Sequence, residues 1–231
     1  MTGRPRPEVY ERTNQFLNVL DKKGLARDAA AHMSDPLIRP GSLVHAMDHY
    51  VADLFAAGTR TAYVSLYSIA VMPATGPGRV AMVRIDDGAR TIEACVAETA
   101  ELGRRMQQRL ATAASDRVPP AGVATPVDVG AFRLSSDEHA TTTWTVEWGA
   151  HQLEVAWPAG DLPFLVDAPA GTFHPTRNYL ATMSGHPDTR VVMDGRRVPG
   201  AATDHPWFTE VLGRTFSTCH LAVAEVALEV T

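Results

Sequence analysis

The chain has almost no lysine: Lys22 and Lys23 are the two lysines among its 21 basic residues, and arginine supplies the rest. Schiff-base chemistry and the phosphate-binding loop of nucleotidases both need a placed lysine. Lys22 and Lys23 stand together before Gly24, where a helix is expected to end, and neither has such a context. Pyridoxal phosphate enzymes and P-loop nucleotidases are therefore disfavoured. Scarce lysine beside frequent alanine and arginine is typical of a GC-rich, bacterial genome.

Cysteine and clustered positive charge are also scarce. Cys95 and Cys219 lie far apart and outside any CxxC pattern, so neither a disulfide framework nor a thiolate zinc site is expected. The net charge is −5, and basic residues form nothing longer than pairs such as Arg104-Arg105. Without a basic stripe to neutralise phosphates, nucleic acid and an anionic membrane surface are not expected as main partners.

Long apolar runs are missing as well. The first residues, MTGRPRPEVYERTN, lack the apolar core of a signal peptide, and the longest apolar run, AYVSLYSIAVMPA, is too short to cross a bilayer. We therefore expect a cytoplasmic protein. No GxGxxG motif follows an expected strand, so a dinucleotide site is not expected. We expect no cofactor, with a bound divalent metal as the alternative.

Residues 1–117 have the apolar spacing of a mainly helical half. With 45% hydrophobic and 20% charged residues, the chain has the composition of a globular protein with a normal core. Two strand-like runs joined by the turn-forming PATGPG predict a hairpin, although the first run could equally be a buried helix. Helices are predicted over 7–20, 25–33, 42–57 and, as one long helix, about 89–114.

Residues 118–231 are predicted to be rich in β-structure, after a Pro- and Gly-containing boundary, SDRVPPAGVATP. TTTWTVEWGAHQLEVAW alternates strictly, and RVVMDGRRV has an Asp-Gly pair suited to a tight hairpin turn. FSTCHLAVAEVALEV predicts a long final strand. A two-residue turn at Gly149-Ala150 would pair Trp148 with His151, Val146 with Leu153 and Trp144 with Val155.

Helices first and an antiparallel sheet afterwards predict an α+β fold. We expect the N-terminal helices to pack on a curved C-terminal antiparallel sheet or partial barrel. The two halves, 1–117 and 118–231, would form one interlocked unit, with a small-molecule pocket in the β-rich half. A homodimer is the generic expectation for such a chain.

Three histidines precede prolines: His174, His186 and His205. Proline forces the residue before it into extended geometry, so each imidazole would sit on a stiff backbone. Stiff imidazoles suit a preorganised site, but they also suit a plain loop corner, which is the commoner case. The site prediction requires that these rings converge in space.

Each of these histidines has a specific role in the predicted site. In SGHPD an extended backbone would point His186 and Asp188 to the same side, so that Asp188 could orient His186 as a base. His205 would cap a helix, where the helix dipole favours the neutral ring. His174 would join His205 as a second acid or electrophile, and Arg177 would anchor an anionic group of the substrate.

A second set of histidines defines the metal alternative. On the predicted helix 42–57, His45 and His49 are four residues apart, which is metal-ligand spacing, and Asp48 lies between them. The HExxH pattern is absent because residue 46 is alanine. A solvated polar face is the default interpretation. A metal could instead be held by His174, His186 and His205.

Tryptophan gathers on one face of the predicted hairpin. Trp144, Trp148 and Trp157 would either form a core or line a cavity for an apolar substrate, and the pattern does not separate these two roles. The favoured function is an enzyme of specialised metabolism that uses histidine and carboxylate acid–base chemistry on a small molecule, as an isomerase, cyclase or hydrolase. The alternatives are a metal-dependent enzyme and a non-catalytic binding or assembly protein.

Overall fold

The computed structural model describes residues 8–10, 43–72, 75–86, 88, 90–113, 125–137, 141–169, 177–204, 209–210 and 217–227. Apart from one helix and the two helical residues Thr209 and Glu210, the elements in this part of the chain are strands. They are β1 (Glu8–Tyr10), β2 (Leu43–Ala56), β3 (Thr59–Val71), β4 (Gly78–Asp86), β5 (Thr91–Ala97), α3 (Ala100–Ala113), β6 (Val127–Val129), β7 (Ala131–Ser136), β8 (Thr142–Trp148), β9 (His151–Trp157), β10 (Phe164–Ala168), β11 (Arg177–Gly185), β12 (Arg190–Met193), β13 (Arg196–Arg197) and β14 (Cys219–Ala227).

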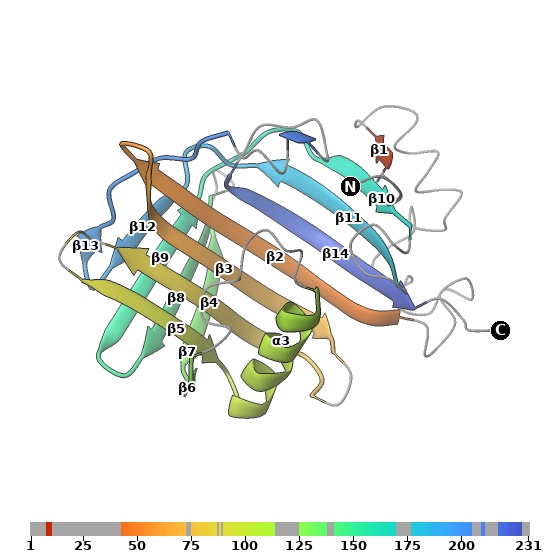
Figure 1. The fold of residues 1–231 in the computed structure, drawn as a ribbon, viewed down its shortest axis with the longest axis horizontal. Coiled ribbons are helices and arrows are strands. Elements are labelled where there is room, and N and C mark those ends of the chain that lie inside the picture. Colours follow the sequence, from red (N-terminus) through yellow and green to blue (C-terminus); the bar gives the residue numbers. More distant parts are fainter. Residues whose placement is uncertain are drawn as a thin grey trace.

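The strands form two sheets. The larger has nine strands in the order β1-β10-β11-β14-β2-β3-β4-β5-β6, and the smaller has five in the order β13-β12-β9-β8-β7. Neighbouring strands are antiparallel except for β5 and β6. Figure 1 shows α3 across one face of the larger sheet and the smaller sheet behind the other face. The larger sheet takes strands from both predicted halves of the chain.

The predicted α+β fold is wrong, because strands occupy most of the segments expected to be helical. Residues 42–57 form β2, and residues 8–10 of the predicted first helix form β1. The predicted helix 89–114 divides into β5 and α3, with the hydroxyl of Thr99 accepting the Leu102 N–H at the start of the helix. The predicted helix 25–33 and the remainder of 7–20 lie outside the described residues.

Burial on both faces explains these errors. Residues 51–54 of β2 are all buried, and so are residues 94–97 of β5. A strand that is covered on both sides loses the alternation of apolar and polar residues, and its apolar residues then also fit a helical spacing. The predicted segment 42–57 ends close to where β2 ends, because Ala57 and Gly58 make a tight turn with positive φ angles of 49° and 79°.

The predictions that rest on local turns are confirmed. β3 and β4 form the expected hairpin, and β8 and β9 pair with Trp148 opposite His151, Val146 opposite Leu153 and Trp144 opposite Val155. β12 and β13 turn at Asp194-Gly195, where both φ angles are positive. The long final strand is β14.

Two apolar cores lie on the two faces of the larger sheet. One lies between this sheet and α3 and includes Met82, Cys95 and Met106. The other lies between the two sheets and includes Trp144 and Trp157, both fully buried. Within the described residues no helix is both long and apolar enough to cross a membrane.

Candidate functional site

Three adjacent strands of the larger sheet bring polar side chains together on the face toward the smaller sheet. β11, β14 and β2 are neighbours, and their register places Ser184 opposite His220 and His220 opposite Tyr50. Side chains directly opposite one another in antiparallel strands share a face, with Cβ atoms about 5 Å apart. His186 follows β11 directly, two residues after Ser184, so an extended backbone directs it to the same face.

Ser184 and His186 are in direct contact. The Ser184 Oγ lies 3.0 Å from Nε2 of His186, and Nδ1 of the same ring lies 2.7 Å from the carbonyl oxygen of Pro158. A carbonyl oxygen only accepts, so Nδ1 carries the proton. In the neutral ring Nε2 is then the acceptor, and the Ser184 hydroxyl donates to it. This is the arrangement of a hydroxyl next to an oriented base.

The environment keeps the imidazole of His186 neutral. Burial lowers its pKa below the ordinary value for histidine, the hydrogen bond to the Pro158 carbonyl opposes this shift, and the charge of His220 lowers the pKa further. Since the ordinary value is 6.5, the ring is in its basic form at neutral pH.

The backbone of His186 is held by several hydrogen bonds. Its N–H donates to the carbonyl of Thr218 at 3.0 Å, and its carbonyl accepts from the hydroxyls of Thr189 and Thr218. Gly160 lies against the ring, and a Cβ there would be 2.1 Å from the Gly185 carbonyl oxygen and 2.7 Å from Nδ1 of His186. Only glycine lets the 158–161 segment approach this closely, so the base is fixed in position.

A second histidine stands next to the Ser184–His186 pair. Nε2 of His220 lies 3.1 Å from Oδ1 of Asp48, and its ring stacks on Tyr50 with 4.3 Å between centroids. Burial and the charge of Asp48 raise the pKa of Tyr50 to about 12, although a hydrogen bond with Thr142 acts in the opposite direction and lowers it. Tyr50 therefore stays protonated. The side chains of His220 and Asp48 are 28% and 50% exposed, so the site reaches solvent.

The structure places one of the three His-Pro histidines. His186 is in the site, but both of its ring nitrogens are engaged by Ser184 and Pro158, and Asp188 is exposed. His174 and His205 lie outside the described residues, so their convergence with His186 stays a prediction. Arg177 is in β11 opposite Ala227, and its side chain is outside the described part.

The three tryptophans are core residues between the sheets. Their exposed fractions are 0% for Trp144, 6% for Trp148 and 0% for Trp157. Nε1 of Trp157 donates to the Val51 carbonyl at 3.2 Å, whereas Nε1 of Trp144 has no hydrogen-bond partner within the described part of the chain. Tyr50 tilts against Trp144 and Trp157, which connects this core to the polar site. A role in substrate binding stays a prediction.

The residues of the metal alternative point in two directions. His45 and His49 lie on the α3 face of β2, where His45 is 2.9 Å from Glu225 and His49 is 2.6 Å from Ser65. Asp48 lies on the opposite face, bonded to His220. Among the described residues, no three or more His, Cys, Asp or Glu side chains form a group that could hold a metal ion.

Two features of the site were missed at the level of sequence. Ser184 and His186 are two residues apart, so the rule that related His186 to Asp188 applies equally in the N-terminal direction and would have found Ser184. His220 follows Cys219, which faces the other core and is fully buried. The contact of His220 with Asp48 joins strands far apart in sequence, and no local pattern signals it.

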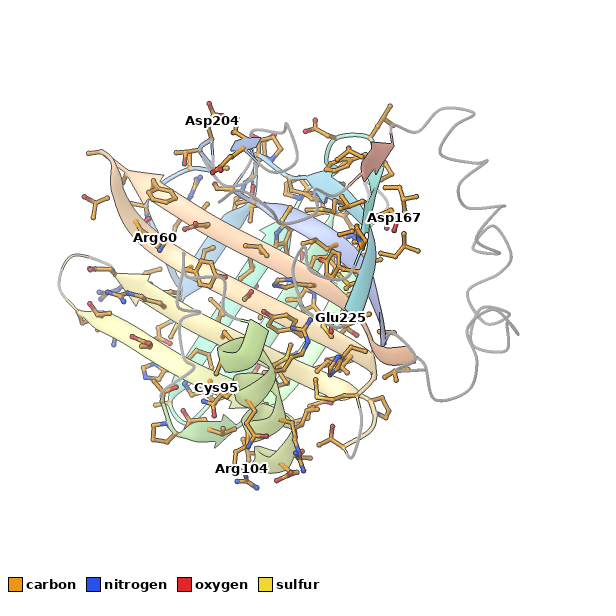
Figure 2. All side chains as sticks on the ribbon, turned by 45° about the vertical axis from the view of Figure 1, so that its right-hand side comes forward. Arg60, Cys95, Arg104, Asp167, Asp204 and Glu225 are labelled. Carbon is orange, nitrogen blue, oxygen red and sulfur yellow. The ribbon has the colours of Figure 1, made fainter. Side chains whose placement is uncertain are left out.

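The α3 face of the larger sheet carries a polar cluster of its own. The Glu225 carboxylate contacts both Arg109, on α3, and His45, on β2, and all three side chains are at most 13% exposed. Figure 2 shows Glu225 on the face of the sheet on which α3 lies. This cluster ties the helix to β14 and β2 by charged hydrogen bonds inside an apolar core.

The fold is thus a mainly antiparallel two-sheet β-structure with one helix described, and the site on β11, β14 and β2 combines serine, histidine and aspartate side chains. No protein-family model and no curated protein sequence matches the chain. Among solved structures, the chain is similar to acetoacetate decarboxylase from Legionella pneumophila subsp. pneumophila, with 12% identity over 80% of this chain and 83% of that chain and a TM-score of 0.30. A likeness this weak transfers neither activity nor residue roles.

Proposed function

We propose that the chain is an enzyme that acts on a small carbonyl compound, with Ser184 as the nucleophile and His186 as its base. The contact that carries this proposal is the 3.0 Å hydrogen bond between Ser184 Oγ and Nε2 of His186, with the tautomer of His186 set by Pro158. Nucleophile, base and orienting group are then in the relation that acyl transfer requires.

The reaction follows from the direction of these hydrogen bonds. The Ser184 oxygen attacks the carbonyl carbon while its proton passes to Nε2 of His186, and the bond to the leaving group breaks to give an acyl-serine. Water then attacks the acyl group, the acyl–serine bond breaks, and His186 returns its proton to Ser184. The proton that the water loses balances the one that the leaving group takes up. The predicted hydrolase chemistry is thereby favoured over isomerisation or cyclisation, which would use His186 as a base without the serine.

The state of His186 supports this role. A base must be unprotonated at the working pH, and the lowered pKa of His186 meets this need. It must also be held still, and the hydrogen bonds to its backbone N–H and carbonyl meet that need.

The test is covalent labelling of the purified chain with a fluorophosphonate, followed by intact mass measurement and peptide mapping. One adduct at Ser184 is expected in the wild type, none in Ser184→Ala, and a rate reduced by at least 10²-fold in His186→Gln, since a positioned base contributes 10²–10⁴-fold. Ser136→Ala, which changes an exposed serine on β7, is the matched control and should label normally.

Two results would contradict the proposal. One is the absence of any adduct at Ser184, and the other is an equal rate of labelling in His186→Gln and the wild type. If Ser184→Ala kept the turnover of a substrate that His186→Gln loses, His186 would act as a base alone. If neither variant changed any activity, the non-catalytic binding alternative would gain support.

A further inference from the structure

His220 faces the same reacting centre as His186 from the neighbouring strand. It is the direct register partner of Ser184 across β11 and β14, and both side chains project toward the smaller sheet. At 28% side-chain exposure, its ring is accessible to a molecule bound at Ser184. Ser184 therefore has one histidine hydrogen-bonded to it and a second histidine opposite it on the neighbouring strand.

The two histidines are held in different ways. His186 uses both ring nitrogens, one on Ser184 and one on Pro158. His220 uses Nε2 on the Asp48 carboxylate, which accepts its proton, and its ring is fixed by stacking on Tyr50. Among the described residues no hydrogen bond engages Nδ1 of His220. Both ring nitrogens of His186 are thus hydrogen-bonded, whereas Nδ1 of His220 can bind a further partner.

We infer that His220 is the general acid of the proposed reaction, with Asp48 and Tyr50 as its positioning residues. This inference rests on the proposed acyl transfer at Ser184. It assigns the proton that the leaving group needs to Nδ1 of His220, while His186 serves the serine.

The proton count closes over one turnover. The turnover starts with His220 as an imidazolium, which carries one proton on Nε2, bonded to Asp48, and one on Nδ1. In the first half the Ser184 proton goes to Nε2 of His186, the oxygen–carbon bond forms, the bond to the leaving group breaks, and the leaving group takes the proton from Nδ1 of His220. In the second half Nδ1 accepts a proton from the attacking water, the acyl–serine bond breaks, and His186 returns its proton to Ser184. Both histidines end as they began, and no oxidant or reductant is needed.

The groups around His220 suit this role. From β2, Asp48 supplies a negative charge at 3.1 Å and Tyr50 is a neutral phenol. After β11, His186 is neutral at pH 7. On the opposite face of the sheet, His49 is also neutral, because burial lowers its pKa to about 3. The carboxylate of Asp48 is in direct contact with the ring, and it orients Nε2 so that Nδ1 is the nitrogen left for the substrate.

The experiment measures how rate depends on the leaving group. The probes are a series of aryl acetates from p-nitrophenyl to p-methoxyphenyl acetate, hydrolysed by the whole chain. General acid catalysis matters little for p-nitrophenolate, which leaves without a proton, and matters most for poor leaving groups. His220→Gln should therefore lose less than about 10-fold with p-nitrophenyl acetate but about 10²–10⁴-fold with p-methoxyphenyl acetate. Asp48→Asn, at a half-exposed residue, should give an intermediate slope.

The chain offers a matched control for the loss of a paired histidine. His151, the first residue of β9, contacts Asp194, in the turn between β12 and β13, at 3.0 Å and forms a second histidine–carboxylate pair. His151→Gln should keep the rates and the slope of the wild type. Fluorophosphonate labelling of Ser184 should survive in His220→Gln, because fluoride leaves without protonation.

The outcomes separate this inference from the proposed function. An equal loss across the ester series, or no loss at all, in both His220→Gln and Asp48→Asn overturns the general-acid role and leaves Ser184 as the nucleophile. A wild-type chain in which Ser184 is not labelled overturns the proposed function, and the role of His220 falls with it.

Discussion

The close packing of Gly160 against Gly185 and the ring of His186 gives the most direct prediction. A methyl group added at Gly160 would lie 2.1 Å from the Gly185 carbonyl oxygen and 2.7 Å from Nδ1 of His186, where 3.4 Å is the start of ordinary contact. The two backbone segments must therefore separate by more than 1 Å in Gly160→Ala. The Pro158 carbonyl belongs to the segment that moves, so Nδ1 of His186 loses its 2.7 Å acceptor.

Two effects of different size follow from this displacement. Forcing an extra methyl group into a packed place costs typically about 1–3 kcal/mol. A misplacement of about 1 Å at a catalytic group can cost roughly 10²-fold in rate. We therefore expect Gly160→Ala to remain folded, with a lower urea midpoint, and to be labelled at Ser184 about 100-fold more slowly than the wild type.

Urea denaturation and the rate of fluorophosphonate labelling measure the two effects on the same samples. The neighbouring exposed residue supplies the control, since Ala159→Ser changes the same segment without approaching His186. A labelling rate of Gly160→Ala within twofold of the wild-type rate would show that the Pro158 carbonyl does not orient the base.

Three further predictions concern stability. Burial lowers the pKa of His49 from 6.5 to about 3, so between these pH values the unfolded chain binds more protons than the folded chain. The free energy of unfolding should therefore rise with pH in this range, by up to about 1.4 kcal/mol per pH unit. Denaturant titrations should show a flatter slope in His49→Gln, and an unchanged slope would refute this. Trp157→Phe removes the indole N–H that donates to the Val51 carbonyl, whereas Trp144→Phe removes an N–H that has no partner among the described residues. Trp157→Phe should therefore lower the free energy of unfolding, measured in urea, by about 1–3 kcal/mol more than Trp144→Phe. Equal losses in the two variants would contradict this. Glu225→Gln changes a side chain that is 9% exposed and should lower the free energy of unfolding by about 3–5 kcal/mol. Glu147→Gln changes an exposed ion pair and should lower it by at most about 1 kcal/mol. Similar shifts in the thermal midpoint of the two variants would show that the α3 cluster contributes no more than a surface pair.

The central strands explain why two polar clusters occur back to back. β2 directs His45 and His49 toward α3 and Asp48 toward the smaller sheet, and β14 likewise directs Glu225 and His220 to opposite faces. Alternation along a strand thus divides one run of polar residues between two sites. A helix at 42–57 would have placed His45 and His49 together as a ligand pair, which is why the error in secondary structure also affected the metal alternative.

Part of the candidate site could be predicted from sequence, and part could not. Pro187 restrains the backbone of His186, which is a local effect, and His186 is in the described site. Nearness in sequence favours Asp188 as the group that orients His186, but the ring is bonded to the carbonyl of Pro158, 28 residues earlier. No rule of spacing selects a backbone carbonyl from another segment, because that contact depends on how β9 and β11 end beside each other.

The sequence alone determined those features in which short-range geometry is decisive. Tight turns at Gly149-Ala150 and Asp194-Gly195 fix the register of their hairpins, because a two-residue loop admits one pairing of the strands that it joins. Tertiary structure decided whether residues 43–56 form a strand or a helix, since cover on both faces removes the alternation by which a strand is recognised. It also decided that Ser184 and His220, on strands separated along the chain, would meet as neighbours in one sheet.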